Sequence, residues 1–127
     1  MQWIILVGNE NLTIQEIKKK DYYNCKQVTQ LENDRVVVDY GAEHVFFDFL
    51  DNLIEDYEKE ELELLPFKNP HFIMMTFTSK KILKQVLMQN NFPTNLYVDD
   101  DDGMIMKMDK YIRLLNENKD NPRGKFK

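Results

Sequence analysis

Hydrophobic residues along this chain come in short runs, each closed by glycine or by a cluster of polar, turn-forming residues. The run from Trp3 to Val7 is β-branched and aromatic and ends at Gly8-Asn9, which predicts a buried strand followed by a turn. The run from His71 to Phe77 is apolar on both alternating faces, the pattern of a central strand. Three more strand-like runs lie close together, at residues 24–31, 35–40 and 44–50. Polar turn clusters separate these three runs, which predicts an antiparallel meander.

Other segments have helical spacing. Thr13, with Glu16 three positions later, forms a capping-box pattern at the start of a short helix. Asp51 can cap a helix that has its apolar residues on one side and ends at Pro66. Two further helices are expected after a cap at Thr78 or Ser79 and after a cap at Asp109.

Near the C-terminus Asp102-Gly103 lies between two apolar runs, which predicts a hairpin because both turn residues tolerate positive φ. The predicted order of elements is β-α-β-β-β-α-β-α-β-β-α. Strands and helices interleave without strict βαβ alternation, so we expect an α+β fold with a mixed or mainly antiparallel sheet and helices packed on at least one face. We expect one globular domain over residues 1–116 and a polar, disordered tail over residues 117–127.

Alternation within residues 44–50 predicts which side chains face the core. One set faces one way, namely Val45, Phe47 and Phe49, and the other set faces the opposite way, namely His44, Phe46 and Asp48. The first set is the more apolar, so it is the expected core face. Phe46 is then expected to be partly exposed or covered by another element.

Composition restricts the location of the protein. The chain has 127 residues and a single cysteine, Cys25, which cannot form an internal disulfide and is typical of a reducing compartment. Every apolar run is far shorter than the ~18 residues that a membrane-spanning helix needs. The apolar run at the amino terminus is also too short for a signal peptide. We therefore expect a cytoplasmic protein with no membrane partner.

The sequence contains no motif for nucleophilic, nucleotide-dependent or zinc-dependent catalysis. His44 and His71 could form an acid–base site if their strands were neighbours. Such a site would also need Asp39 or Asp48 close by. We expect no catalytic residue and no cofactor, and the histidine pair is kept as an alternative.

Four consecutive aspartates precede Gly103: Asp99, Asp100, Asp101 and Asp102. A calcium-binding loop with Gly103 at its sixth position would need an acidic residue at its first position, where this chain has Val98. It would also need Glu at its twelfth position, where this chain has Asp109. We therefore expect solvated carboxylates on a hairpin turn. A weakly bound cation remains an alternative.

Acidic residues are concentrated in one stretch. Residues 39–63 hold ten of the 22 acidic residues and one lysine, Lys59, whereas the whole chain has a net charge of −5. Such a surface repels nucleic acid and attracts a basic protein. Aromatic residues among the charges are typical of protein-recognition patches. The candidate partner-binding residues are Tyr40, Phe46, Asp48, Glu55, Asp56, Tyr57, Glu58, Glu60 and Glu61.

These patterns favour a small, acidic, non-enzymatic protein that binds a basic macromolecular partner. The chain is similar in size and charge to bacterial immunity proteins, which neutralise a toxin, so a toxin is the most specific partner considered. Two alternatives stay open. One is a small metal-dependent enzyme that uses the aspartates at 99–102 and the histidines, and the other is a homodimer formed through the outward face of Phe46.

Overall fold

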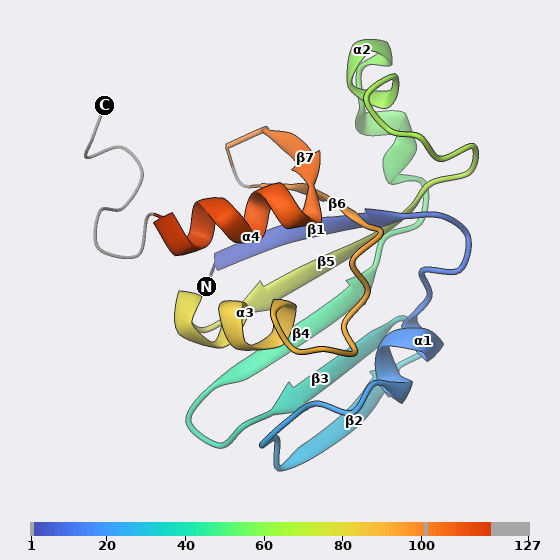
Figure 1. Ribbon diagram of the computed structural model, residues 1–127. Helices are drawn as coiled ribbons and strands as arrows, with labels where there is room; N and C mark the ends of the chain where they lie inside the picture. Colours follow the sequence, from blue (N-terminus) through green and yellow to red (C-terminus); the bar gives the residue numbers. More distant parts are fainter. Residues whose placement is uncertain (1, 101, 118–127) are drawn as a thin grey trace.

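The computed structural model describes residues 2–100 and 102–117 (Figure 1). In this range seven strands form one antiparallel sheet with the spatial order β2-β3-β4-β5-β1-β6-β7. The strands are β1 (Gln2–Gly8), β2 (Gln27–Glu32), β3 (Arg35–Asp39), β4 (His44–Phe49), β5 (His71–Phe77), β6 (Tyr97–Asp99) and β7 (Ile105–Lys107). The helices are α1 (Ile14–Lys19), the 3₁₀ helix η1 (Leu53–Asp56), α2 (Lys59–Leu62), α3 (Lys80–Leu87) and α4 (Met108–Glu117). The predicted α+β fold is confirmed.

Strand β5 lies in the middle of the sheet, between β4 and β1, as its apolar pattern on both faces predicts. The meander β2-β3-β4 continues the sheet on one side of β5, with the pairs Val38–Val28 and Val38–Val45 in register. The hairpin β6-β7 continues it on the other side of β1. The outermost strands are β2, which has a bulge between Gln30 and Glu32, and β7, which is three residues long.

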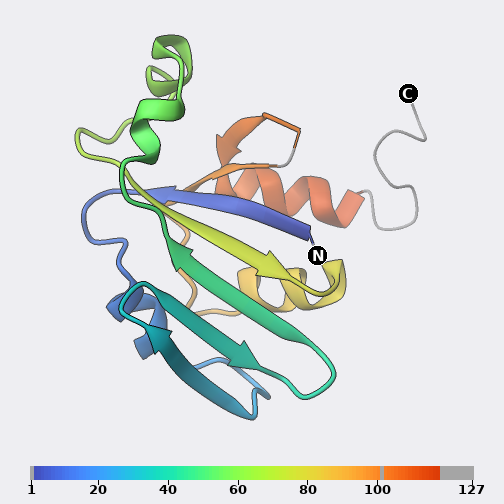
Figure 2. The ribbon, with the colours of Figure 1, turned by 180° about the vertical axis from the view of Figure 1, so that it is seen from behind.

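Helices α1, α3 and α4 lie on one face of the sheet (Figure 1). The main hydrophobic core fills the space between these helices and the sheet, and its largest fully buried side chains include Phe47, Phe77 and Phe92. The view from behind shows that no described helix lies over β3, β4 or β5 on the other face (Figure 2). Phe46 is on this open face and is half-buried, as expected from its alternation with Phe47.

A second, smaller core cluster lies on the opposite face of the sheet from the three helices, at the β1 and β6 end. Its buried members are Ile5, Val7, Leu65 and Phe72. The segment 51–65, which contains η1 and α2, covers this cluster with Leu53, Tyr57 and Leu62. This segment extends beyond the end of the sheet (Figure 1).

The prediction of one helix from Asp51 to Pro66 is wrong. Asn52 precedes η1 in the left-handed region, at φ 61°, and makes no side-chain capping hydrogen bond. Tyr57 is extended, at φ −99° and ψ 142°, and therefore separates η1 from α2. Glu58 then starts α2, and its backbone N–H donates a hydrogen bond of 2.8 Å to Oε1 of Glu61, as in a capping box. The apolar spacing predicts one helical face, whereas the extended Tyr57 turns its ring onto Phe72 of the sheet.

The other helix starts agree more closely with the sequence. The Thr13 hydroxyl accepts a hydrogen bond from the Glu16 N–H at 3.2 Å, and the Ser79 hydroxyl accepts one from the Ile82 N–H at 3.3 Å. Asp109 lies in the first turn of α4 rather than before it, because the helix begins at Met108. An acidic side chain in the first turn is favoured by the helix dipole.

Helix α4 ends at Glu117, the first residue of the expected tail, and residues 118–127 of that tail lie outside the described residues. None of the helices in the described part of the chain is both long and apolar enough to cross a bilayer.

Candidate partner-binding surfaces

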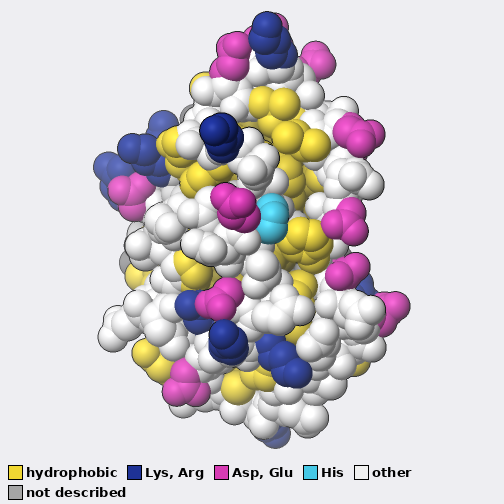
Figure 3. Space-filling model, turned by 90° about the vertical axis from the view of Figure 1, so that its right-hand side faces the viewer, with side chains coloured by type: hydrophobic (Ala, Val, Ile, Leu, Met, Phe, Trp, Pro, Cys, Tyr) yellow, Lys and Arg dark blue, Asp and Glu magenta, His cyan; other side chains and the backbone are white. Residues whose placement is uncertain are grey.

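The segment of residues 51–65, here called the acidic arm, carries the densest charge in the structure. It has one basic residue, Lys59, and seven acidic ones, which are Asp51, Glu55, Asp56, Glu58, Glu60, Glu61 and Glu63. All seven except the partly buried Glu61 are exposed. Two apolar side chains are exposed between them, Ile54 at 40% and Leu64 at 58%. Figure 3 shows hydrophobic side chains in a band between acidic groups at the top and along the right-hand margin.

Tyr57 fixes the acidic arm to the sheet. Its ring packs on Phe72 with the centroids 5.1 Å apart, and its hydroxyl donates a hydrogen bond of 2.6 Å to Oδ2 of Asp99 on β6. Burial raises the pKa of Asp99, and the nearby charges of Asp100 and Glu61 raise it further, while the hydrogen bond from Tyr57 opposes them. Burial and the Asp99 carboxylate in turn raise the pKa of Tyr57 far above its ordinary value, so the hydroxyl stays protonated.

The three aromatic candidates of the predicted patch lie in three different places. Tyr57 is under the acidic arm, and Phe46 is on the open face of the sheet. Tyr40 instead packs against the main core on the helix side, because it has the same alternation as Val36 and Val38. Its hydroxyl is buried and makes no hydrogen bond to any described residue, and burial raises its pKa to about 12. The predicted single patch is therefore divided, and only the charged residues 55–61 stay together.

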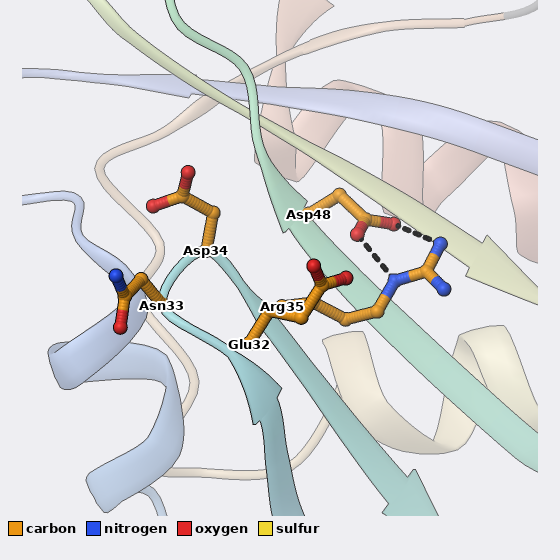
Figure 4. A pocket seen from close by; sticks show the side chains of 5 residues that line it. All are labelled: Glu32, Asn33, Asp34, Arg35 and Asp48. Atoms are coloured by element: carbon orange, nitrogen blue, oxygen red, sulfur yellow. Dashed lines mark hydrogen bonds and ion pairs between the residues drawn. The ribbon is translucent and has the colours of Figure 1, made fainter.

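Asp48 also lies away from the acidic arm, on the open face of the sheet. It forms a bidentate ion pair with Arg35 on β3, at 2.6 Å and 3.2 Å. The Arg35 guanidinium also lies over the Phe46 ring, 5.3 Å from its centroid, in cation–π geometry. At the end of the β2-β3 hairpin a surface hollow of about 430 Å³ is lined by Glu32, Asn33, Asp34, Arg35 and Asp48 (Figure 4). In that view the Asp48 carboxylate faces Arg35, whereas Asp34 points away from it.

The aspartate turn does not present the row of solvated carboxylates that we expected. Asp99 is bonded to Tyr57, and Asp100 is only 5% exposed. Oδ1 of Asp100 accepts hydrogen bonds from the backbone N–H groups of Asp102 and Met104, both at 2.9 Å. Asp102 is exposed, and Asp101 lies outside the described residues. The turn therefore uses Asp100 as an internal acceptor for its own backbone.

The aspartates and histidines do not assemble into a metal or acid–base centre in the described residues. No group of three or more His, Cys, Asp or Glu side chains there is arranged to hold a metal ion. His44 and His71 begin two neighbouring antiparallel strands, so they lie at opposite ends of the sheet. His44 is 3.3 Å from Oδ1 of Asp39, whereas His71 contacts the carbonyl oxygen of Leu12 at 2.9 Å through Nδ1.

Charge is divided between the layers of the molecule. Helices α1, α3 and α4 carry more basic than acidic residues, the basic ones being Lys18, Lys19, Lys80, Lys81, Lys84, Lys110 and Arg113 and the acidic ones Glu16, Asp109 and Glu117. The acidic arm carries the opposite excess. Sequence reasoning found the acidic stretch but missed this counterpart, because the basic residues are spread over three helices far apart in the chain.

Comparisons with known proteins gave no relative: no family model, no curated protein and no solved structure matches the chain. Fold and surfaces together define an antiparallel α+β protein with an acidic arm at one end of the sheet and one open sheet face.

Proposed function

We propose that this protein binds a basic protein through the acidic arm, and that it works as a binding protein rather than as an enzyme. The observation that supports this most strongly is the exposure of Ile54 and Leu64 among the acidic side chains of residues 51–65. In such an interface the apolar side chains supply contact area at the centre, and the surrounding negative charges favour a partner with a basic surface. A toxin with a basic surface, neutralised as immunity proteins neutralise theirs, is the most specific version of this partner.

Electrostatic arguments support a protein partner of this charge. A concentrated negative field speeds the encounter with a basic surface and repels the phosphates of nucleic acid. Tyr57 and Leu65 hold the base of the arm on the second core cluster, so the surface is presented on an anchored support. A fixed surface loses less conformational entropy on binding than a disordered acidic segment would.

The test uses a defined probe, a fluorescent amphipathic peptide of lysine and leucine, with binding followed by anisotropy at low and high salt. The arm variant combines Glu55→Lys, Glu60→Lys and Glu63→Lys, three exposed residues whose side chains make no hydrogen bond to any described residue. The matched control combines Glu10→Lys, Glu32→Lys and Glu117→Lys, which change the net charge equally at exposed sites elsewhere. We expect the arm variant to bind about tenfold or more weakly, about 1.4 kcal/mol, and the control to lose much less.

Equal loss in both variants would mean that the peptide senses only net charge, and the proposal would then be wrong. A second pair of variants tests the apolar anchors. Leu64→Ser should weaken binding at high salt, where the charges are screened, while Met88→Ser, at a similarly exposed methionine after α3, should not.

A further inference from the structure

The open face of the sheet carries one continuous row of apolar and β-branched side chains. Register places its members opposite one another on five adjacent strands, in the order Thr29, Val37, Phe46, Thr76 and Trp3. Each of them is half-buried. Helices α1, α3 and α4 cover the opposite face, and the acidic arm covers only the end near β1 and β6 (Figures 1 and 2). An antiparallel sheet can leave one face to solvent, but the apolar members of this row offer area that a second layer would bury.

Charged residues flank this row on both sides, and their order is informative. Two positions along the strands in one direction lie Arg35 on β3 and Asp48 on β4, which are Cα partners. Two positions in the other direction lie Asp39 on β3 and His44 on β4, also Cα partners. On β3 the row residue therefore lies midway between two opposite charges, Arg35 and Asp39. On β4 it lies midway between a carboxylate and an imidazole, those of Asp48 and His44.

If a second copy is placed face to face on the first, the charged residues beside the row of one copy lie opposite complementary groups in the other. A twofold axis along the row brings each row residue over its own counterpart and reverses the strand direction. Arg35 of one copy then lies over Asp39 of the other, and Asp48 lies over His44. The ~30° angle between aligned packed sheets shifts these positions by a few Å, which the length of an arginine side chain accommodates.

We propose that a second copy of this chain covers the open face, packed sheet against sheet about a twofold axis along the row from Thr29 to Trp3. None of the row residues belongs to the acidic arm, although Trp3 packs against the edge of the second core cluster, and the dimer does not depend on the proposed function. Five strands about 4.8 Å apart and five residues long give a contact of roughly 20 Å by 17 Å per copy. Over both copies that is about 680 Å², below the range of stable specific interfaces, so we expect the dimer to be weak and to depend on concentration.

The experiment is sedimentation of the full chain between about 1 μM and 1 mM, together with emission of Trp3, the only tryptophan. We expect the 15.3 kDa species to shift toward twice that mass, and the Trp3 emission to move to shorter wavelength over the same concentration range. Phe46→Lys places two like charges against each other across the axis and should leave the protein monomeric. Met88→Lys, at an exposed position directly after α3 on the helix side, should dimerise like the wild type.

A charge-swapped variant separates loss of the dimer from loss of the fold. The double change Arg35→Asp with Asp48→Arg keeps an ion pair within each copy but brings like charges together between copies. We expect this variant to melt close to the wild-type temperature and yet to sediment as a monomer. A wild type that stays monomeric at 1 mM would overturn the proposal. So would unchanged dimerisation of the Phe46→Lys or charge-swapped variants, or a Trp3 emission that does not follow the mass.

Discussion

The hydrogen bond from Tyr57 to Asp99 connects residues 42 positions apart and joins the acidic arm to β6. It forms in a half-buried place where Asp99 also meets the charges of Asp100 and Glu61. An ionised carboxylate there is unfavourable for the folded state, and the phenol compensates part of that cost. The hydrogen bond that joins the arm to β6 therefore ends on a carboxylate whose ionised form is unfavourable in that place.

Replacing Tyr57 by Phe should destabilise the protein by about 1 kcal/mol at pH 7, because packing on Phe72 is kept while the hydrogen bond to a charged group is lost. The variant's Asp99 should have a still higher pKa, since the phenol is what lowers it. A carboxyl whose pKa is higher in the folded than in the unfolded protein lowers the free energy of unfolding at neutral pH. This cost disappears as the pH falls from the folded pKa to the unfolded pKa. The penalty of Tyr57→Phe should thus shrink in acid. Urea unfolding at pH 7 and pH 4 measures this, and an equal penalty at both values would contradict it.

Glu43 shows the opposite sign of pH dependence. Its carboxylate accepts hydrogen bonds from the hydroxyls of Thr78 at 2.6 Å and Ser79 at 2.8 Å, and these bonds lower its pKa. A lowered folded pKa contributes stability above the ordinary carboxyl pKa, and this contribution is lost as the pH falls through the lowered value. We expect Glu43→Gln to lower the melting temperature at pH 7 and to flatten its fall between pH 5 and pH 2. Thermal melts across that range test this, with Glu10→Gln, at an exposed glutamate, as the control.

At the scale of elements, local patterns predicted most of the sheet. Alternation in residues 35–39 and 44–49 and the dense apolar run of β5 gave the correct strands, and Ser79 was among the predicted caps of α3. The same alternation also pointed Tyr40 inward with Val38, which the interpretation of an aromatic patch overlooked. The broken helix at 51–65 could not be foreseen in this way, because Tyr57 is held extended by Phe72 and Asp99, two residues remote in sequence. For the candidate partner-binding surface, the sequence predicted only the concentration of acidic residues. It could not predict that the aromatic candidates lie in three different places, because their positions depend on which strands are neighbours.

The β6-β7 hairpin turn gives a prediction at this scale. Gly103 has a φ of 81°, and a Cβ added there would meet nothing within 4 Å, so only the backbone conformation opposes substitution. Gly103→Val should destabilise by roughly 1 kcal/mol or more, because a β-branched residue resists positive φ. Asp100→Ala should cost a similar amount, since two backbone N–H groups lose their acceptor, whereas Asp100→Asn keeps an oxygen there and should cost less. Chemical unfolding of the three variants measures this order, and a more harmful Asp100→Asn than Asp100→Ala would contradict the internal acceptor role.

At the scale of the whole molecule, one face of the sheet is covered by helices and the other is largely open to solvent. The helix layer closes the main core and carries the basic excess, while the sheet layer is covered only at one end, by the acidic arm. The bulge in β2 and the short β7 make the outer strands poor templates for edge pairing. Edge pairing is therefore disfavoured, and the two proposals place association on the open sheet face and on the acidic arm.

The acidic arm and the helix layer carry opposite excess charge, although the net charge of the whole chain is only −5. In concentrated solution at low ionic strength, the arm of one molecule attracts the helices of the next. Such a contact is heterologous, so we expect it to add molecules one after another into open chains unless the rotation between neighbours closes a ring. Added salt dissolves such chains, because the attraction acts between exposed charges. The proposed sheet-to-sheet dimer buries apolar side chains, so added salt should weaken it far less. A salt titration therefore distinguishes the two kinds of self-association.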